Sequence, residues 1–214
     1  MISAQEALER LQEGNCRFVS GVRSRDTLTS QTRRKALVEG QAPFASILGC
    51  SDSRVPVEIV FDQDLGDLFV IRVAGNIVAS SQIGSVEFAA ERLGTRLVVV
   101  LGHSRYGAVL ATLEELQRPT KSQSPNLRSI VDRIRPSVEE LLPTELRHDP
   151  DALVRHAVRS NVLASVNHLR HGSEVIERLI RKHELLVVGA EYSLETGAVD
   201  FFDGVSAAGN GLPR

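Results

Sequence analysis

The sequence has few cysteines and no excess of charge of either sign. Among 214 residues only Cys16 and Cys50 are cysteines, too few for a disulfide framework, so each is a candidate free thiol or metal ligand. The 25 basic and 27 acidic side chains nearly cancel, to a formal net charge of −2. This balance excludes the strongly basic footprint of a protein devoted to nucleic acid or anionic lipid. We therefore expect no nucleic acid partner.

Long apolar runs are also missing. The longest, such as residues 97–101, contain about five residues, whereas a helix needs roughly 20 to cross a bilayer. Glu6 stands where a secretory signal requires a basic and then an apolar region. These features predict a cytoplasmic protein without membrane association. With 42% hydrophobic and 24% charged residues, the chain has the composition of a globular domain that buries a sizeable core.

Near-continuous apolar runs at residues 45–48, 68–73 and 97–101 are typical of strands in a parallel sheet covered on both faces. Between the last two, residues 85–93 repeat apolar positions at helical spacing and stop at Gly94, which predicts a strand–helix–strand unit with a right-handed crossover. Two C-terminal apolar runs, at residues 185–188 and 198–202, predict a hairpin. The fold class is therefore α/β, a mostly parallel β-sheet of about four parallel strands plus a C-terminal antiparallel strand, flanked by helices.

Helical periodicity indicates further helices, the first of which opens with Ser3 and Glu6 in a capping-box arrangement. We expect Pro136 to kink or interrupt one of them. The predicted ranges are 3–20, 107–116, 126–141, 152–170 and 173–182. No linker divides the chain, so we expect a single domain over 1–214, with an N-terminal helical arm at about 1–40 and an α/β core at about 41–205.

Polar side chains follow the predicted strands at the edge where ligands bind in open α/β sheets. Cys50, Asp52 and Arg54 come directly after the first strand, and His103 ends the third. Each has a structural alternative: a buried cysteine beside an ion pair, and a packing histidine. If the two strands are neighbours, sulfur and imidazole meet as a zinc pair. The segment 72–76 follows the remaining strand, where Gly75 allows a close approach or forms an ordinary turn.

Together with Gly84–Glu87, Gly107–Val109, Val187–Ala190 and Glu195–Gly197, these segments resemble the β-class carbonic anhydrases in order and spacing from about residue 3 to residue 203. The resemblance implies a zinc enzyme that reversibly hydrates carbon dioxide to bicarbonate. It also implies a homodimer or dimer-based higher oligomer, with the N-terminal helix reaching over its partner. In that family two cysteines and one histidine hold the zinc ion.

By this resemblance Cys50 and His103 match zinc ligands, and Asp52 matches the carboxylate that occupies the fourth zinc position in a closed state. Asp52 and Arg54 also match the pair that orients the reacting group. The positions that match the substrate cleft are Gln41, Phe69, Ala74 and Gly107, with core packing an equal alternative for Phe69 and Ala74. The remaining histidines are expected to be solvated, and one of them is an alternative proton shuttle: His148, His156, His168, His171 and His183.

The sequence departs from the family at Tyr106, where His-x-x-Cys-Gly would supply the second thiolate. Cys16 lies in the N-terminal helix and is expected to be an incidental thiol. A phenol is harder to deprotonate than a thiol, with a pKa of about 10 against about 8.5, and its oxygen lies farther from the backbone. Either the Tyr106 ring fills the metal site, or it swings aside with its hydroxyl toward a bound anion.

Three functions stay open at this point. The first is a zinc-dependent carbonate dehydratase slowed by an incomplete ligand set. The second is a metal-free or weakly metal-binding relative that binds bicarbonate or another small anion without efficient catalysis. The third, a nucleotide-binding protein, is disfavoured because no Gly-x-Gly-x-x-Gly or phosphate-loop pattern follows any strand.

Overall fold

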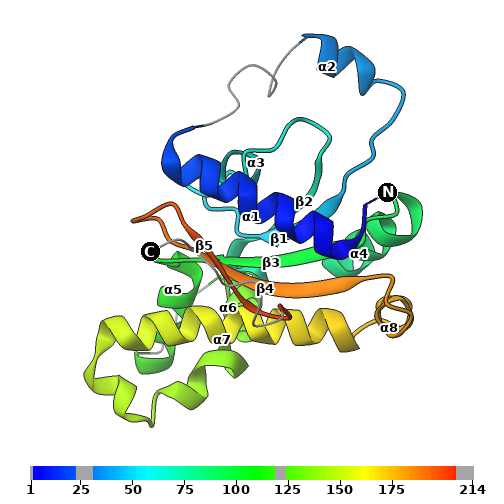
Figure 1. Ribbon diagram of the computed structural model, residues 1–214. Helices are drawn as coiled ribbons and strands as arrows, with labels where there is room; N and C mark the ends of the chain where they lie inside the picture. The colour runs from blue at the N-terminus through cyan, green and yellow to red at the C-terminus, as the bar shows by residue number, and fades with distance from the viewer. Residues whose placement is uncertain (1, 23–30, 119–123, 206–214) are drawn as a thin grey trace.

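The computed structural model describes residues 2–22, 31–118 and 124–205. A five-stranded sheet in the order β2-β1-β3-β4-β5 lies between layers of helices (Figure 1). The strands are β1 (Ala45–Gly49), β2 (Leu68–Arg72), β3 (Leu97–His103), β4 (Leu186–Tyr192) and β5 (Val199–Asp203). The first four are parallel and β5 is antiparallel to β4. The predicted fold class is confirmed.

The helices lie close to the predicted ranges, with two additions. The α-helices are α1 (Ala4–Ser20), α2 (Gln31–Ala36), α3 (Val57–Val60), α4 (Ser80–Arg92), α5 (Gly107–Gln117), α6 (Pro125–Val138), α7 (Pro150–His171) and α8 (Glu174–Arg181). Short 3₁₀ turns are η1 (Ala74–Asn76), η2 (Glu139–Leu141) and η3 (Glu145–His148). The sequence analysis missed α2 and α3, which are too short to show a helical period.

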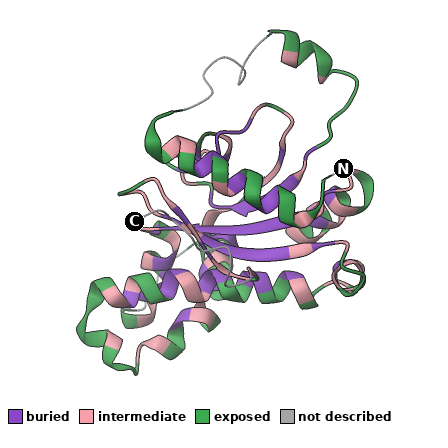
Figure 2. Cartoon of the chain, in the orientation of Figure 1, coloured by how far each residue is buried: buried purple, intermediate pink, exposed green. Residues whose placement is uncertain are grey.

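The sheet carries a core on each face. On one face, Ala7, Leu8 and Leu11 of α1 are buried against the sheet, so this part of the expected N-terminal arm belongs to the core of its own chain. The capping box of Ser3 and Glu6 starts this helix as predicted. On the opposite face, α4, α7 and α8 pack on the sheet. Figure 2 shows the buried residues concentrated along the sheet between these layers.

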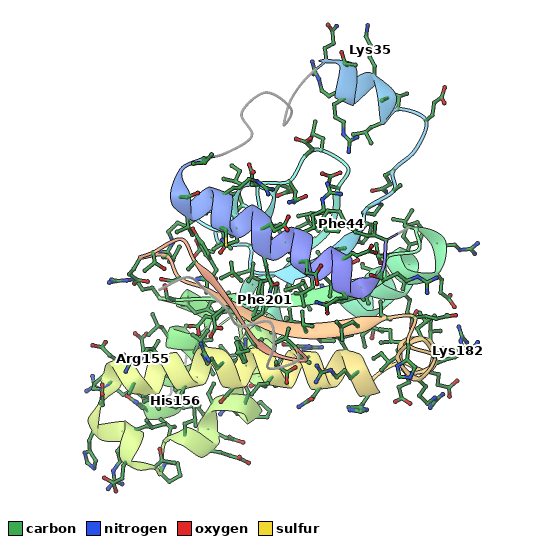
Figure 3. The ribbon with its side chains drawn as sticks, viewed as in Figure 1. Lys35, Phe44, Arg155, His156, Lys182 and Phe201 are labelled. Atoms are coloured by element: carbon green, nitrogen blue, oxygen red, sulfur yellow. The ribbon has the colours of Figure 1, made fainter. Side chains whose placement is uncertain are left out.

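The outward faces of the helices are polar. Arg155 and His156 extend from α7 into solvent in Figure 3, whereas Phe201 of β5 lies inside the molecule and is buried. The five histidines that were expected to be solvated are all exposed. Among the described residues, no helix is both long enough and apolar enough to span a membrane.

The prediction that Pro136 kinks or interrupts a helix over 126–141 agrees in part with the structure. The α6 helix passes through Pro136 and ends two residues later, at Val138, where the 3₁₀ turn η2 follows. Proline lacks the N–H that would bond the carbonyl four residues earlier, and near the end of a helix this loss leaves the preceding turns intact. A third core, formed by α5, α6 and α7, contains Cys50 and Tyr106. This core adjoins the edge of the sheet where the predicted site residues lie.

Candidate active site

Cys50 follows the last residue of β1 and is buried, with 7% of its surface exposed. Arg72, at the end of β2, holds this turn: its Nε donates to the Cys50 carbonyl at 2.9 Å, and its Nη2 to the Asp52 carbonyl at 2.6 Å. Two neighbouring parallel strands thus fix the position of the thiol and of the carboxylate that follows it.

Asp52 and Arg54 form the predicted ion pair. Arg54 donates Nε to Oδ1 at 2.9 Å and Nη2 to Oδ2 at 2.6 Å, and its backbone N–H also bonds Oδ1 at 2.9 Å. Such a two-pronged pair is among the strong hydrogen-bond arrangements of proteins. It holds the pKa of Asp52 well below its usual value, so the carboxylate is ionised at neutral pH.

His103 is the last residue of β3 and is fully buried. Its Nδ1 lies 2.8 Å from the Ser104 carbonyl, which can only accept, so Nδ1 carries the proton and Nε2 is left with a free lone pair. Among the described residues Nε2 has no hydrogen-bond partner, and it lies 3.8 Å from Oδ2 of Asp52. A buried nitrogen without a partner is costly, and it is a ready metal ligand.

The pairing of β1 with β3 brings Cys50 and His103 together as expected. Burial raises the pKa of the Cys50 thiol, but the polar groups of His103, the Gly75 backbone and Tyr106 beside it outweigh burial and lower the pKa to about 7. A large fraction of the thiol is therefore thiolate at neutral pH, the form that binds metals.

Tyr106, at the position of the missing thiolate, lies inside the protein with no exposed surface. Its ring centroid is 4.0 Å from that of His103, and its hydroxyl donates to Oδ1 of Asn76 at 2.5 Å. Burial, and then the charge of Cys50, raises the pKa of Tyr106 well above its usual value. The hydroxyl is therefore a neutral donor, bonded to Asn76, and the ring lies against His103 and Cys50.

Asn76 belongs to a buried polar network that the sequence analysis did not identify. Asn161 of α7 donates to Oδ1 of Asn76 at 3.4 Å and to the Gly75 carbonyl at 2.9 Å. Ser165, one turn later, donates to the Asn76 carbonyl at 3.0 Å. Gly75 has φ of +80°, and a Cβ there would lie 2.8 Å from Ile134, so this turn requires glycine. The spacing of Asn161 and Ser165 by four residues on one helix face was the available signal.

Of the remaining predicted residues, the structure brings Ala74 and Gly107 next to this centre and leaves Phe69 and Gln41 toward the other end of the β1–β2 pair. Ala74 lies in η1, next to the network, and Gly107 opens α5 directly after Tyr106. Phe69 is half-buried on β2 and packs on Phe88, with 6.2 Å between ring centroids. Gln41 is exposed before β1.

Cys16 is an exposed free thiol on α1. Its helix covers the face of the sheet that carries the first core. Cys50 packs in the separate core of α5, α6 and α7. Cys16 therefore does not supply the missing thiolate in this arrangement.

The donors of this site fit a zinc ion incompletely. Catalytic zinc takes three protein ligands and keeps one open position, and here Cys50 and His103 supply two. Within the described part of the chain, no three His, Cys, Asp or Glu side chains lie close enough together to hold a metal ion. Asp52 is the available third donor, but it is paired with Arg54. The donor set fits zinc only if Asp52 exchanges Arg54 for the metal.

Comparison with known proteins agrees with this architecture. The family model described as carbonic anhydrase matches residues 45–199. Carbonic anhydrase 2 of Mycobacterium tuberculosis is 39% identical over 203 residues, 95% of each chain. The carbonic anhydrase of Pseudomonas aeruginosa is 37% identical over 180 residues, 80% of this chain and 79% of that protein.

Solved structures agree as well. The β-carbonic anhydrase CcaA superposes with a TM-score of 0.71 at 27% identity, over 94% of this chain and 93% of that one. A tetrameric β-carbonic anhydrase of Sordaria macrospora gives 0.70 at 25% identity, over 79% and 85% of the two chains. The sheet order, the turn after β1 and the extent of these matches lead to one conclusion: the chain belongs to the β-class carbonic anhydrase family.

Proposed function

We propose that this protein reversibly hydrates carbon dioxide to bicarbonate, with a zinc ion bound less tightly than a second thiolate would allow. The family membership and the 39% identity to a carbonic anhydrase over 95% of the chain support the reaction. The observation that carries the proposal is the buried Nε2 of His103, which has no partner among the described residues and lies beside Cys50 and 3.8 Å from Asp52. Cys50, His103 and Asp52 are the residues that would hold zinc.

The residues around this centre have defined tasks in the proposal. Zinc, when bound, lowers the pKa of a water molecule from 15.7 to about 7. Arg54 keeps Asp52 ionised and fixes the direction of its oxygens, and the Ser104 carbonyl keeps the proton of His103 on Nδ1. Asp52 then has two competing tasks, as a metal ligand and as a hydrogen-bond acceptor paired with Arg54. This competition is the reason to expect a slow enzyme.

The proposal includes an assembly and a place for substrate. We place the substrate cleft next to Gln41, Phe69, Ala74 and Gly107, in a cytoplasmic dimer or a larger assembly of dimers. The tetrameric relative from Sordaria macrospora supports an oligomer. Light scattering on the purified chain tests it, and a mass equal to one chain of 23.4 kDa would exclude a stable dimer.

The reaction is tested by zinc titration and by stopped-flow measurement of carbon dioxide hydration on the purified protein. We expect a catalysed rate that requires zinc, and loss of both zinc binding and rate in His103→Ala. His171→Ala is the matched control, because this histidine is exposed on α7. A protein that holds no zinc in zinc-supplemented buffer and hydrates carbon dioxide at the uncatalysed rate overturns the proposal.

A second candidate function is binding of bicarbonate or another small anion without efficient catalysis. The observation that favours it is the buried Tyr106 hydroxyl bonded to Asn76, which leaves no second thiolate next to His103. Calorimetric titration of the metal-free protein with bicarbonate tests it. Saturable binding together with an uncatalysed rate supports this candidate over the first, and absence of binding rejects it.

A further inference from the structure

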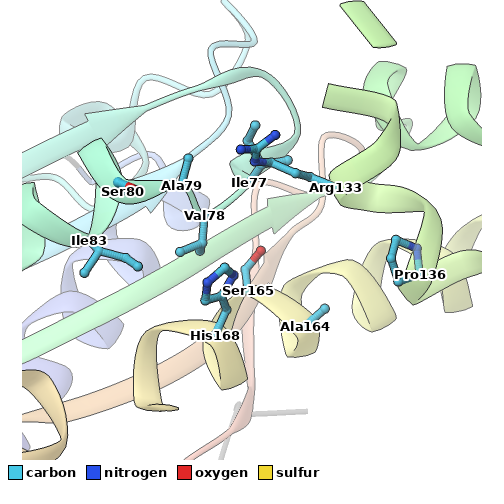
Figure 4. A pocket seen from close by; sticks show the side chains of 10 residues that line it. All are labelled: Ile77, Val78, Ala79, Ser80, Ile83, Arg133, Pro136, Ala164, Ser165 and His168. Carbon is cyan, nitrogen blue, oxygen red and sulfur yellow. The ribbon is translucent and has the colours of Figure 1, made fainter. Parts of the chain in front are cut away.

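A cavity of about 440 Å³ lies between α4, α6 and α7. This volume falls within the range of roughly 300–1,000 Å³ that is typical of small-molecule sites. None of the residues that line it is a proposed metal ligand or a member of the Asp52–Arg54 pair. Its walls come from the connection before α4 and the first turn of that helix, from one face of α6 and from the middle of α7 (Figure 4).

Most of the lining is apolar. Figure 4 shows Val78 and Ile83 on one side and Pro136 and Ala164 on the other, around one space. Val78 is buried and Ile83 is half-buried, so the inner part of the cavity is an apolar surface at the edge of the second core. Such a surface binds the hydrocarbon part of a ligand.

The polar groups of the cavity are basic or neutral. In Figure 4, Arg133 reaches from α6 toward Ile77, and His168 extends from α7 toward Val78. No Asp or Glu lines the cavity, and in the described ranges no carboxylate pairs with Arg133. One Arg133 N–H bonds the Ser129 carbonyl at 3.1 Å, and a guanidinium has four further N–H donors. These donors suit a carboxylate.

We propose that this cavity binds a small monocarboxylate with an apolar body, such as a short fatty acid or an aromatic acid. The carboxylate lies against Arg133 and His168, and the hydrocarbon lies against Val78, Ile83 and Ala164. A single negative charge matches the basic lining, and the apolar inner surface excludes a fully polar anion such as bicarbonate. No proposed zinc ligand lines this site, although Ser165, which does, also bonds the Asn76 carbonyl. The inference does not depend on the function proposed above.

The experiment is calorimetric titration of the full chain with hexanoate. A chelator first removes any metal ion, so that hexanoate binding to a metal does not add to the measured heat. Hexanol and hexylammonium are the comparison ligands of equal chain length. We expect saturable binding of hexanoate and much weaker binding of the other two. Arg133→Gln removes a charge-assisted hydrogen bond and is expected to weaken hexanoate binding by about fivefold to tenfold.

Three further variants locate the ligand. Ala164→Leu fills the cavity from an exposed helix position and is expected to abolish binding without unfolding the chain. Arg128→Gln on α6 and His171→Gln on α7 are matched controls, because both side chains are exposed and neither lines the cavity. We expect the two controls to bind hexanoate as the wild type does.

Any of four results overturns the proposal. These are absence of saturation at millimolar hexanoate, equal binding of hexanol and hexanoate, unchanged affinity in Arg133→Gln, and unchanged affinity in Ala164→Leu. A dimer that dissociates in Arg133→Gln, without any hexanoate binding by the wild type, would show instead that a second copy of the chain covers the cavity.

Discussion

Tyr106 has the position of a metal ligand and the contacts of a core residue. From the same backbone position, its phenol oxygen lies farther from Cα than a cysteine sulfur would, and it donates to Asn76. The ring packs on His103, and the hydroxyl joins a buried network with Asn161 and Ser165. Where the family resemblance implies a thiolate, this chain therefore has a hydrogen bond within the core.

We predict that Tyr106→Phe lowers the free energy of unfolding by about 1–2 kcal/mol, because the buried Oδ1 of Asn76 loses its short hydrogen bond. Urea denaturation measures this change. Tyr192→Phe is the matched control, since in the described part of the chain burial alone, and no hydrogen bond, acts on that hydroxyl, and we expect a change below about 0.5 kcal/mol. Equal effects of the two substitutions would contradict the role given to Asn76.

Glu195 allows a prediction about acid stability. Hydrogen bonds from the Ser104 hydroxyl at 2.6 Å and from Arg105 at 2.7 Å lower its pKa from 4.5 to about 2. A carboxyl group with a lower pKa in the folded state stabilises that state above its unfolded pKa, and this stabilisation is lost as the pH falls toward 2. We expect Glu195→Gln to be less stable than the wild type at pH 7, with a difference that shrinks below pH 4.5. A difference independent of pH in chemical denaturation would disagree with this.

At the scale of elements, the site depends on two strand pairings. The pairing of β1 with β2 ties the Cys50 turn to Arg72, and the pairing of β1 with β3 sets His103 beside it. The helix α7 also stabilises the site, because Asn161 and Ser165 donate hydrogen bonds to the turn at Gly75 and Asn76. These hydrogen bonds require α7 to lie close to β3.

Two glycines test this close approach with opposite expectations. A Cβ on Gly102 of β3 would lie 2.6 Å from a methyl of Val162 on α7, so we predict that Gly102→Ala destabilises the fold by about 1–3 kcal/mol. A Cβ on Gly84, inside α4, would have no neighbour within 4 Å, so Gly84→Ala is expected to stabilise by up to about 1 kcal/mol. Thermal or urea unfolding of both variants measures whether each change raises or lowers the stability. An unchanged stability of Gly102→Ala would contradict the close packing of α7 on β3, and a loss in Gly84→Ala would contradict the open space around Gly84.

For the whole molecule, the sheet and most helices were predictable because they depend on local patterns. Apolar runs near 45–48 and 97–101 mark buried parallel strands, and the Ser3 capping box marks the start of α1. The meeting of Cys50 and His103 followed from strand adjacency. The direction of the Tyr106 side chain could not be predicted, because the network that it joins links Asn76 to Asn161 and Ser165. These residues are 85 and 89 positions from Asn76 in the chain.

For the whole protein, membership of the family does not by itself determine how active the site is. The chain matches its relatives over most of their length and shares their fold. The proposed difference in activity lies in one position, Tyr106, where the family resemblance implies a thiolate. Function depends on the residues of a site more than on the fold that carries them.

The most direct measurement compares zinc affinity and carbon dioxide hydration in the wild type, Tyr106→Cys and Tyr106→Phe under identical conditions. The proposed function predicts that Tyr106→Cys binds zinc at least about tenfold more tightly and is faster, because Asp52 then stays paired with Arg54. Tyr106→Phe adds no ligand and is expected to gain no zinc affinity over the wild type. If Tyr106→Cys folds and gains neither zinc affinity nor rate, Tyr106 does not limit this site and the central claim is wrong.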